Sequence, residues 1–233
     1  RSITPNTRMI ILNSPSNPTG VVQKRDALSE IVRIALEHGL IILSDEVYQD
    51  FVYEGEHVSL AELVEDKSKL ILINSFSKSF AMTGWRIGWT ASGAVISDAM
   101  NRIHQYLTVC GVSFAQKGVA SILDDPGLPE YLREMNAEFH RRYEVWRNAF
   151  QNLECVTLVP PAGAFYIFPE FNIPGMDAEQ LCDRCLDDIQ VAMVPGNIFG
   201  EQYSHCARIS YGRDLDTQKE AASRLVEYIR KMF

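Results

Sequence analysis

Residues 41–46 read Ile41-Ile42-Leu43-Ser44-Asp45-Glu46, a short apolar run that ends abruptly in polar side chains. Residues 10–14 and 70–75 have the same form, Ile-Ile-Leu-Asn-Ser and Leu-Ile-Leu-Ile-Asn-Ser. None of the three runs alternates polar with apolar residues, which is typical of strands buried on both faces of a parallel sheet. We therefore predict buried strands at residues 10–12, 41–43 and 70–73.

The segment between the first two strands predicts a helix. Residues 26–37 carry Leu28, Ile31, Val32 and Ala35 at helical spacing, and Gly39 follows as a candidate C-cap. Strand, helix and strand in this order form a βαβ unit, whose crossover is expected to be right-handed. The fold class predicted for the first part of the chain is therefore α/β, with a mostly parallel central sheet flanked by helices.

The rest of this first domain, predicted to span residues 1–127, adds one strand and two helices. A turn at Thr83-Gly84 precedes a predicted strand at residues 85–91. Helical spacing then covers residues 95–107 and 113–123, and Asp124-Asp125-Pro126-Gly127 breaks the pattern.

Residues 128–233 are predicted to form an interdomain helix and a smaller α+β domain. Pro129 opens a long charged helix that runs to about residue 151. Asp177 and Gln180 have the spacing of an N-cap and N3 pair ahead of another helix. Strands are predicted at residues 156–159, 164–168, 191–194 and 207–211, and a terminal helix at residues 214–232.

The composition excludes several classes of protein. Of 233 residues, 46% are hydrophobic and 22% are charged, which is ordinary for a globular chain, and no apolar run is long enough to cross a membrane. The net charge of −8, without a Lys/Arg run, argues against nucleic acid as a partner. The odd number of cysteines, five, indicates a reducing, cytoplasmic setting. Cys182 and Cys185 have the spacing of half a zinc site, but no second pair completes it, so we predict packing and no metal site.

Polar residues follow each of the three buried strands, where ligands of open α/β sheets bind. The carboxyl ends of the strands should bring these side chains to one crevice, which the loop Asn17-Pro18-Thr19-Gly20 could close from one side. The candidate site residues in this crevice are Asp45, Tyr48, Ser75, Ser77, Lys78 and Arg86.

These side chains match the chemical demands of pyridoxal 5'-phosphate. A partly desolvated lysine such as Lys78 is a nucleophilic amine that can form a Schiff base with an aldehyde. Nearby serine hydroxyls and the Arg86 guanidinium could bind a phosphate. A carboxylate such as Asp45 would keep an aromatic ring nitrogen protonated. An aldehyde, a phosphate and a ring nitrogen occur together in this cofactor.

The sequence resembles the class I/II aminotransferases of pyridoxal-phosphate fold type I. Five blocks carry the resemblance in the family's order and spacing, across nearly the whole chain: Asn17-Pro18-Thr19-Gly20, Ser44-Asp45-Glu46-Val47-Tyr48, Ser75-Phe76-Ser77-Lys78-Ser79-Phe80, Gly84-Trp85-Arg86-Ile87-Gly88 and Arg208-Ile209-Ser210-Tyr211.

The resemblance implies an enzyme that moves an amino group from an amino acid to a 2-oxo acid. Lys78 would hold the cofactor as an internal aldimine and shuttle the substrate's Cα proton. Asp45 would pair with the pyridinium nitrogen and Tyr48 with the phenolic oxygen. Ser75, Ser77 and Arg86 would bind the phosphate. Arg208 would grip the substrate α-carboxylate, and Asn17 would contact both that carboxylate and the phenolic oxygen.

The sequence also departs from the family pattern in two respects. Members of the family have about twice this length of large-domain sequence, including a phosphate-binding loop, an aromatic residue that stacks on the cofactor and a tyrosine lent by the second subunit of a homodimer. We therefore expect the chain to be the C-terminal part of such an enzyme, incomplete at its N-terminus. Residues 103–116 also lack the arginine that the aspartate-specific branch carries near this place.

Two other functions remain open. The same cofactor site could serve a β-lyase of the cystathionine type, or the domain could sense a ligand within a transcriptional regulator. Individual residues also have structural interpretations: Tyr48 could be a core aromatic, and Ser77 could serve only the turn that it lies in. Phe165 and Tyr166 fit either the substrate pocket or a half-buried strand.

Overall fold

The computed structural model describes residues 2–232, which form two compact units. Of the described residues, the first unit contains 2–15 and 22–133, and the second contains 16–21 and 134–232. The last passage of the chain from the first unit to the second lies inside a helix, between residues 133 and 134, whereas the sequence predicts the domain boundary ahead of that helix, after residue 127. Within residues 2–232, no helix has the length and apolar character that crossing a membrane requires.

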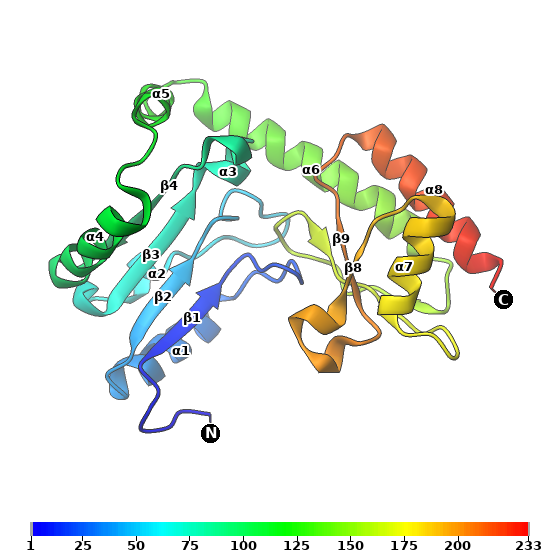
Figure 1. Cartoon of the computed structure of the whole chain (residues 1–233), viewed down its shortest axis with the longest axis horizontal. Coiled ribbons are helices and arrows are strands. Elements are labelled where there is room, and N and C mark those ends of the chain that lie inside the picture. Colours follow the sequence, from blue (N-terminus) through cyan, green and yellow to red (C-terminus); the bar gives the residue numbers. More distant parts are fainter. Residues whose placement is uncertain (1, 233) are drawn as a thin grey trace. The chain divides into compact units, whose positions relative to one another are not determined.

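The first unit is built on a four-stranded mixed sheet in the order β1-β2-β3-β4 (Figure 1). The strands β1 (Met9–Asn13), β2 (Ile41–Asp45) and β3 (Leu70–Ser75) are parallel. The fourth, β4 (Gly88–Ser92), runs antiparallel to β3. The predicted α/β class is confirmed, and the parallel strands bring their carboxyl ends to one edge of the sheet.

One detail of the strand prediction is wrong. The strand β1 lies at an edge of the sheet and is not buried on both faces, because 69% of the Ile11 surface is exposed. An unbroken apolar run reports strand propensity, but it cannot report whether both faces are covered.

Helix α1 (Arg25–Glu37) and the short α2 (Leu60–Leu63) pack on the sheet and form its main core. The buried residues of α1 are Leu28, Val32 and Ala35, which share one helical face as predicted. They contact buried Ile42 of β2 and Leu70 of β3 in one hydrophobic cluster. Gly39 has a φ of +65°, in the left-handed region that commonly ends a helix with glycine.

The segment between β3 and β4 differs from the prediction of a strand at residues 85–91. The chain first forms α3 (Phe76–Ser79) and then a short 3₁₀ turn at Thr83–Trp85. Arg86 follows in a left-handed conformation with a φ of +56°, and the strand begins only at Gly88. The 3₁₀ turn and Arg86 reverse the chain direction before β4 begins, and the apolar pattern of the sequence does not reveal this reversal.

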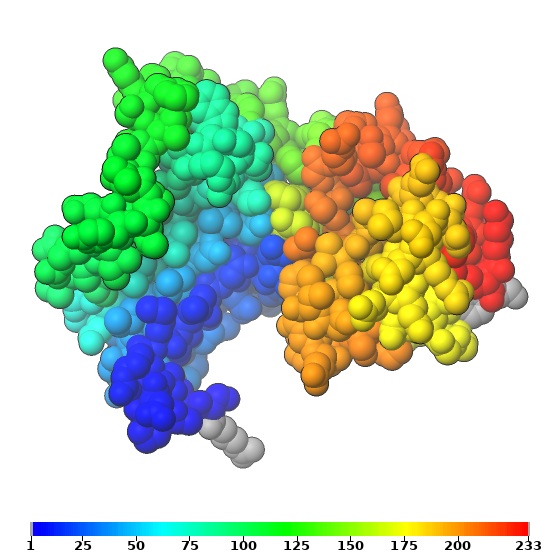
Figure 2. All heavy atoms as spheres, viewed as in Figure 1, coloured from blue at the N-terminus to red at the C-terminus, as the bar shows by residue number. Residues whose placement is uncertain are grey.

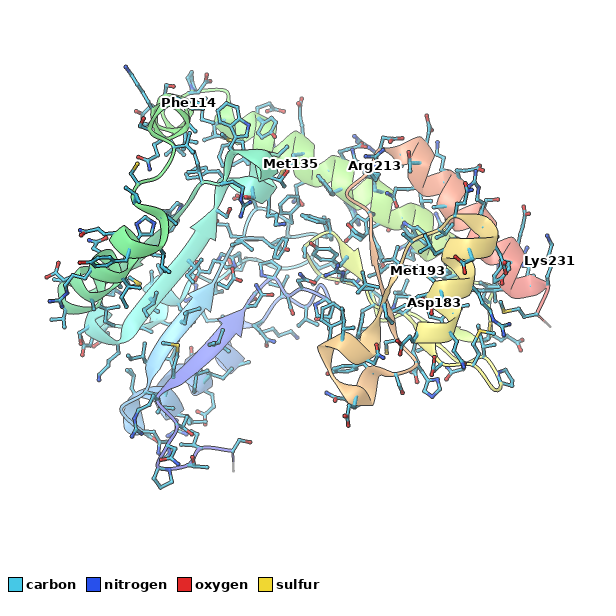
Figure 3. All side chains as sticks on the ribbon, viewed as in Figure 1. Phe114, Met135, Asp183, Met193, Arg213 and Lys231 are labelled. Atoms are coloured by element: carbon cyan, nitrogen blue, oxygen red, sulfur yellow. The ribbon has the colours of Figure 1, made fainter. Side chains whose placement is uncertain are left out.

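Three long helices follow, close to their predicted ranges: α4 (Ala94–Thr108), α5 (Ser113–Leu123) and α6 (Leu128–Phe150). None of the α4 residues is buried, and the side chains of Ile103, Tyr106 and Leu107 are exposed. Figure 2 shows α4 and α5 in green at the surface, and Figure 3 labels the exposed Phe114 of α5.

The second unit contains two small antiparallel sheets. One pairs β5 (Val156–Thr157) with β7 (Glu170–Phe171), and the other has the order β6-β9-β8. Its strands are β6 (Tyr166–Ile167), β9 (Ala207–Ser210) and β8 (Val194–Pro195). The strand expected at residues 191–194 is thus shifted toward Pro195, because only Val194 and Pro195 pair with β9.

Two helices complete the second unit, and their caps match the sequence pattern. Helix α7 (Ala178–Ile189) begins with a capping box in which Asp177 and Gln180 bond each other's backbone. Helix α8 (Leu215–Arg230) begins at Asp214, whose carboxylate accepts the Thr217 amide at 2.9 Å. Cys182 and Cys185 lie on the buried face of α7, where burial and nearby negative charge raise the pKa of each thiol to about 12.

Trp146 of α6 is the largest fully buried side chain of this unit, with 1% of its surface exposed. Its indole Nε1–H donates to Oε1 of buried Gln218 at 2.8 Å. Replacing Trp146 with alanine should lower the free energy of unfolding of this unit by about 3–5 kcal/mol, through the cavity and the unpaired Gln218 oxygen. Urea unfolding, followed by far-UV circular dichroism, measures this change in the free energy of unfolding.

The matched control is Leu186→Ala on α7, an exposed large-to-small change in the same unit. It should change the free energy of unfolding by less than about 1 kcal/mol. Similar losses from both variants would contradict the central role assigned to Trp146.

Candidate functional site

The first group of predicted residues lies at the carboxyl ends of β2 and β3 in the first unit. Asp45 ends β2, Ser75 ends β3, and Lys78 lies in α3 directly after β3. The strands are adjacent and parallel, so their ends meet at one edge of the sheet, as the sequence predicts. The backbone also ties this edge together: the Ser14 amide and the Asn13 side chain both donate to the Asp45 carbonyl.

Lys78, Tyr48 and Asp45 are close enough to influence one another. The Lys78 Nζ lies 5.8 Å from the centroid of the Tyr48 ring, and only 4% of the Tyr48 surface is exposed. Burial raises the pKa of the half-buried Asp45, and the charge of Glu46 adds to that increase. The Val47 amide and the positive charge of Lys78 act in the opposite direction. The site therefore pairs an amine with a carboxylate that binds a proton more readily than usual.

Ser75 and Ser77 shape the turn that carries Lys78. The Ser75 Oγ accepts the Ser77 amide at 3.1 Å as the N-cap of α3, and it donates to the Ile87 carbonyl at 3.2 Å. Binding a phosphate oxygen would require the hydroxyl proton to turn away from Ile87.

Arg86 lies two residues ahead of the strand that pairs with Ser75. Gly88 of β4 is the register partner of Ser75, which places Arg86 near the same edge of the sheet. A Cβ on Gly88 would come within 2.7 Å of the Asn74 carbonyl, so this close approach requires glycine. The exposed Arg86 guanidinium donates one bond to the Thr83 carbonyl at 2.9 Å. A guanidinium has five N–H donors, so others remain for an anion.

The second group, Asn17 and Arg208, lies within the second unit. Residues 16–21 pack on residues 161–163 there, and the Gly20 carbonyl accepts the amides of Ala162 and Gly163. Gly20 has a φ of +69°, and a Cβ on it would come within 2.4 Å of the Pro161 Cβ. This contact holds Asn17 so that its Oδ1 accepts Nη1 of Arg208 at 2.9 Å.

Two aromatic rings hold the Arg208 guanidinium. Its Cζ lies 4.8 Å from the centroid of the Tyr166 ring and 5.3 Å from that of Phe199. The Arg208 Nε is buried and has no hydrogen-bond partner. Buried donors of this kind are normally paired. A guanidinium held by two rings and by Asn17 can offer its remaining Nη donors to a carboxylate.

The sequence did not identify three contributors to these sites. Phe199 lies in the 3₁₀ segment Gly196–Phe199, where the one-dimensional pattern gives no signal for stacking on Arg208. Buried Glu46 and half-buried His57 form a pair in which His57 Nε2 lies 3.2 Å from Glu46 Oε2. The Asp45-Glu46 doublet at a strand end was the only signal that pointed to this pair. Among residues 2–232, no cluster of three or more His, Cys, Asp or Glu side chains is arranged to hold a metal ion.

Comparisons with known proteins agree with the predicted resemblance. The model of the family described as aminotransferase class I and II matches residues 1–225. The chain is 38% identical to an aspartate aminotransferase of Pyrococcus abyssi and to aromatic-amino-acid aminotransferase 2 of Thermococcus litoralis, over 98% of this chain in each case. It spans 59% of the length of these relatives.

The fold agrees as well. The crystal structure of an aromatic aminotransferase from Pyrococcus horikoshii superposes with a TM-score of 0.94 at 36% identity, covering 100% of this chain and 63% of that one. An aspartate aminotransferase structure from Thermotoga maritima gives a TM-score of 0.89 at 31% identity, covering 98% of this chain and 58% of that one.

Proposed function

Because the chain belongs to the class I and II aminotransferase family, we propose that it carries the lysine, the ring-nitrogen partner and the carboxylate-binding arginine of a pyridoxal-phosphate-dependent aminotransferase. The reaction moves an amino group from an amino acid to a 2-oxo acid. The observation that carries the proposal is the gathering of Lys78, Tyr48 and Asp45 at the carboxyl ends of β2 and β3.

The chemistry of this donor set fits pyridoxal 5'-phosphate. The cofactor supplies an aldehyde and a ring that accepts electrons from the substrate Cα. The Lys78 amine is the group that binds the aldehyde carbon. The Asp45 carboxylate would pair with the ring nitrogen, and its negative charge would keep that nitrogen protonated. Ser75, Ser77 and Arg86 offer hydroxyls and a guanidinium to the phosphate, and the buried Tyr48 contributes its hydroxyl to the phenolic oxygen.

Within the proposed reaction, Lys78 also moves the proton. The Lys78 Nζ would serve as the base that removes the proton from the substrate Cα and returns it after the amino group has moved. Arg208 and Asn17 hold the α-carboxylate, which fixes the direction of the Cα–H bond. One donor of the Arg208 guanidinium is on Asn17, and its other Nη hydrogens are available to that carboxylate.

We also propose a cytoplasmic location and a homodimer. The location is supported by the cysteines, which are all free thiols in the structure. The homodimer rests on the family resemblance described above.

The decisive experiment is a titration with pyridoxal 5'-phosphate, followed by borohydride reduction and peptide mapping. We expect the covalent adduct at Lys78, with saturable visible absorbance before reduction. Lys117→Ala, an exposed lysine of α5 in the same unit, should leave the adduct unchanged. An adduct spread over several surface lysines, or an undiminished adduct in Lys78→Ala, would overturn the proposal.

A further inference from the structure

A buried carboxylate lies next to Asp45 and takes no part in the proposed chemistry. Glu46 follows the last residue of β2, and only 4% of its surface is exposed. Acidic side chains are rarely buried to this degree unless they are paired. Glu46 therefore needs a structural or functional explanation.

The Glu46 carboxylate is fully engaged by neighbouring donors. Its Oε1 accepts the Ser44 hydroxyl at 2.9 Å, the Leu60 amide at 3.0 Å and the Ser59 hydroxyl at 3.2 Å. Its Oε2 lies 3.2 Å from Nε2 of His57. Burial alone would raise the pKa of Glu46, yet these hydrogen bonds together hold the pKa below its usual range. An ionised carboxylate only accepts, so the proton of this contact lies on His57 Nε2.

These contacts join two segments that are separate in the sequence. His57, Ser59 and Leu60 precede or begin α2, whereas Glu46 belongs to the turn after β2. The Glu46 amide donates to the Ile73 carbonyl of β3 at 2.9 Å, and the Glu46 carbonyl accepts the Gln49 amide at 3.0 Å. The side chain and the backbone of Glu46 thus hold the turn from both sides.

The turn carries two of the proposed site residues. Asp45 immediately precedes Glu46, and Tyr48 follows two positions later. The Phe51 amide donates to the Tyr48 carbonyl at 2.9 Å, which closes the next turn of the chain. A shift of Glu46 would therefore displace both Asp45 and Tyr48, since backbone connects all three.

We propose that Glu46 is a positioning residue: its buried carboxylate, held by His57, Ser59 and the Leu60 amide, fixes the turn that presents Asp45 and Tyr48 to the cofactor. This inference rests on the proposed function. Glu46 does not touch the cofactor in this assignment. It acts through the neighbouring residues.

The test compares Glu46→Ala with Leu28→Ala, a core variant that destabilises the same unit away from the turn. Each is titrated with pyridoxal 5'-phosphate under conditions where circular dichroism shows it folded. We expect about tenfold weaker cofactor binding and a shifted visible absorbance band in Glu46→Ala, with neither change in Leu28→Ala. Glu46→Gln should restore most of both properties, because its amide oxygen can still accept from Ser44, Ser59 and Leu60, and its amide nitrogen can donate to His57 Nε2 when the imidazole proton moves to Nδ1. Equal effects in Glu46→Ala and Leu28→Ala would overturn the proposal.

A measurement without cofactor separates this inference from the proposed function. Amide hydrogen exchange at Gln49 and Phe51 should accelerate at least about tenfold in Glu46→Ala beyond any change in Leu28→Ala. Suppose that exchange is faster in Glu46→Ala but the wild type forms no adduct at Lys78. This outcome would refute the proposed function and leave the role of Glu46 in fixing the turn intact. Unchanged exchange would refute the positioning role. If Glu46→Ala does not fold, His57→Ala can replace it, because it removes one donor to the carboxylate. It should weaken cofactor binding and accelerate amide exchange by about threefold each.

Discussion

Lys78→Ala is expected to lower the rate of transamination by roughly 10⁴–10⁶-fold, in the form of the protein that binds the cofactor. The substitution removes the group proposed both to bind the cofactor aldehyde and to move the Cα proton. Both roles end together, so the loss should exceed that of any other single substitution in the site. Single-turnover absorbance with an amino acid donor measures it.

Two further results would make this prediction specific. Lys117→Ala should retain the wild-type rate, because Lys117 is exposed on α5. Added methylamine should recover part of the activity of Lys78→Ala, since a small amine can replace the missing base. A Lys78→Ala variant that retained more than a tenth of the wild-type rate would exclude Lys78 as the central residue.

Arg208→Ala is expected to lower kcat/KM by about 10²–10³-fold, for the amino acid and for the 2-oxo acid alike. This corresponds to about 3–4 kcal/mol, the range for removing one partner of a buried charged pair. Both proposed substrates carry an α-carboxylate, and the guanidinium held near the Tyr166 and Phe199 rings is the group proposed to bind it. Steady-state kinetics with each substrate varied in turn measure the effect.

Arg208→Lys should recover only part of this loss, because an ammonium group cannot form the two parallel bonds of a guanidinium. Arg213→Ala is the matched control, because this arginine lies ahead of α8 (Figure 3) and its side chain is exposed. A loss confined to one of the two substrates would show that Arg208 binds something other than their shared carboxylate.

Local patterns predicted much of the fold correctly. The spacing of Leu28, Val32 and Ala35 gave the buried face of α1, and the Asp177 and Gln180 pair marked the start of α7. These signals work because helix periodicity and capping depend on residues a few positions apart. The exposed face of β1 and the late start of β4 depend on distant neighbours, and there the predictions failed.

The candidate site likewise has features that the sequence predicts and features that depend on the fold. The sequence by itself determined the chemical inventory, because an amine, a carboxylate and a guanidinium are properties of Lys78, Asp45 and Arg208 as residue types. The turns that present Asp45 and Lys78 could also be located, since each follows an apolar run.

Only the tertiary structure decided how these groups are held. The burial of Glu46 against residues 57–60 and the stacking of Arg208 between Tyr166 and Phe199 join segments that are far apart along the chain. The unpaired Nε of Arg208 likewise became visible only in the folded chain. The physical reason is that burial and hydrogen bonding depend on which distant segments pack together, whereas a residue's chemistry belongs to the residue itself.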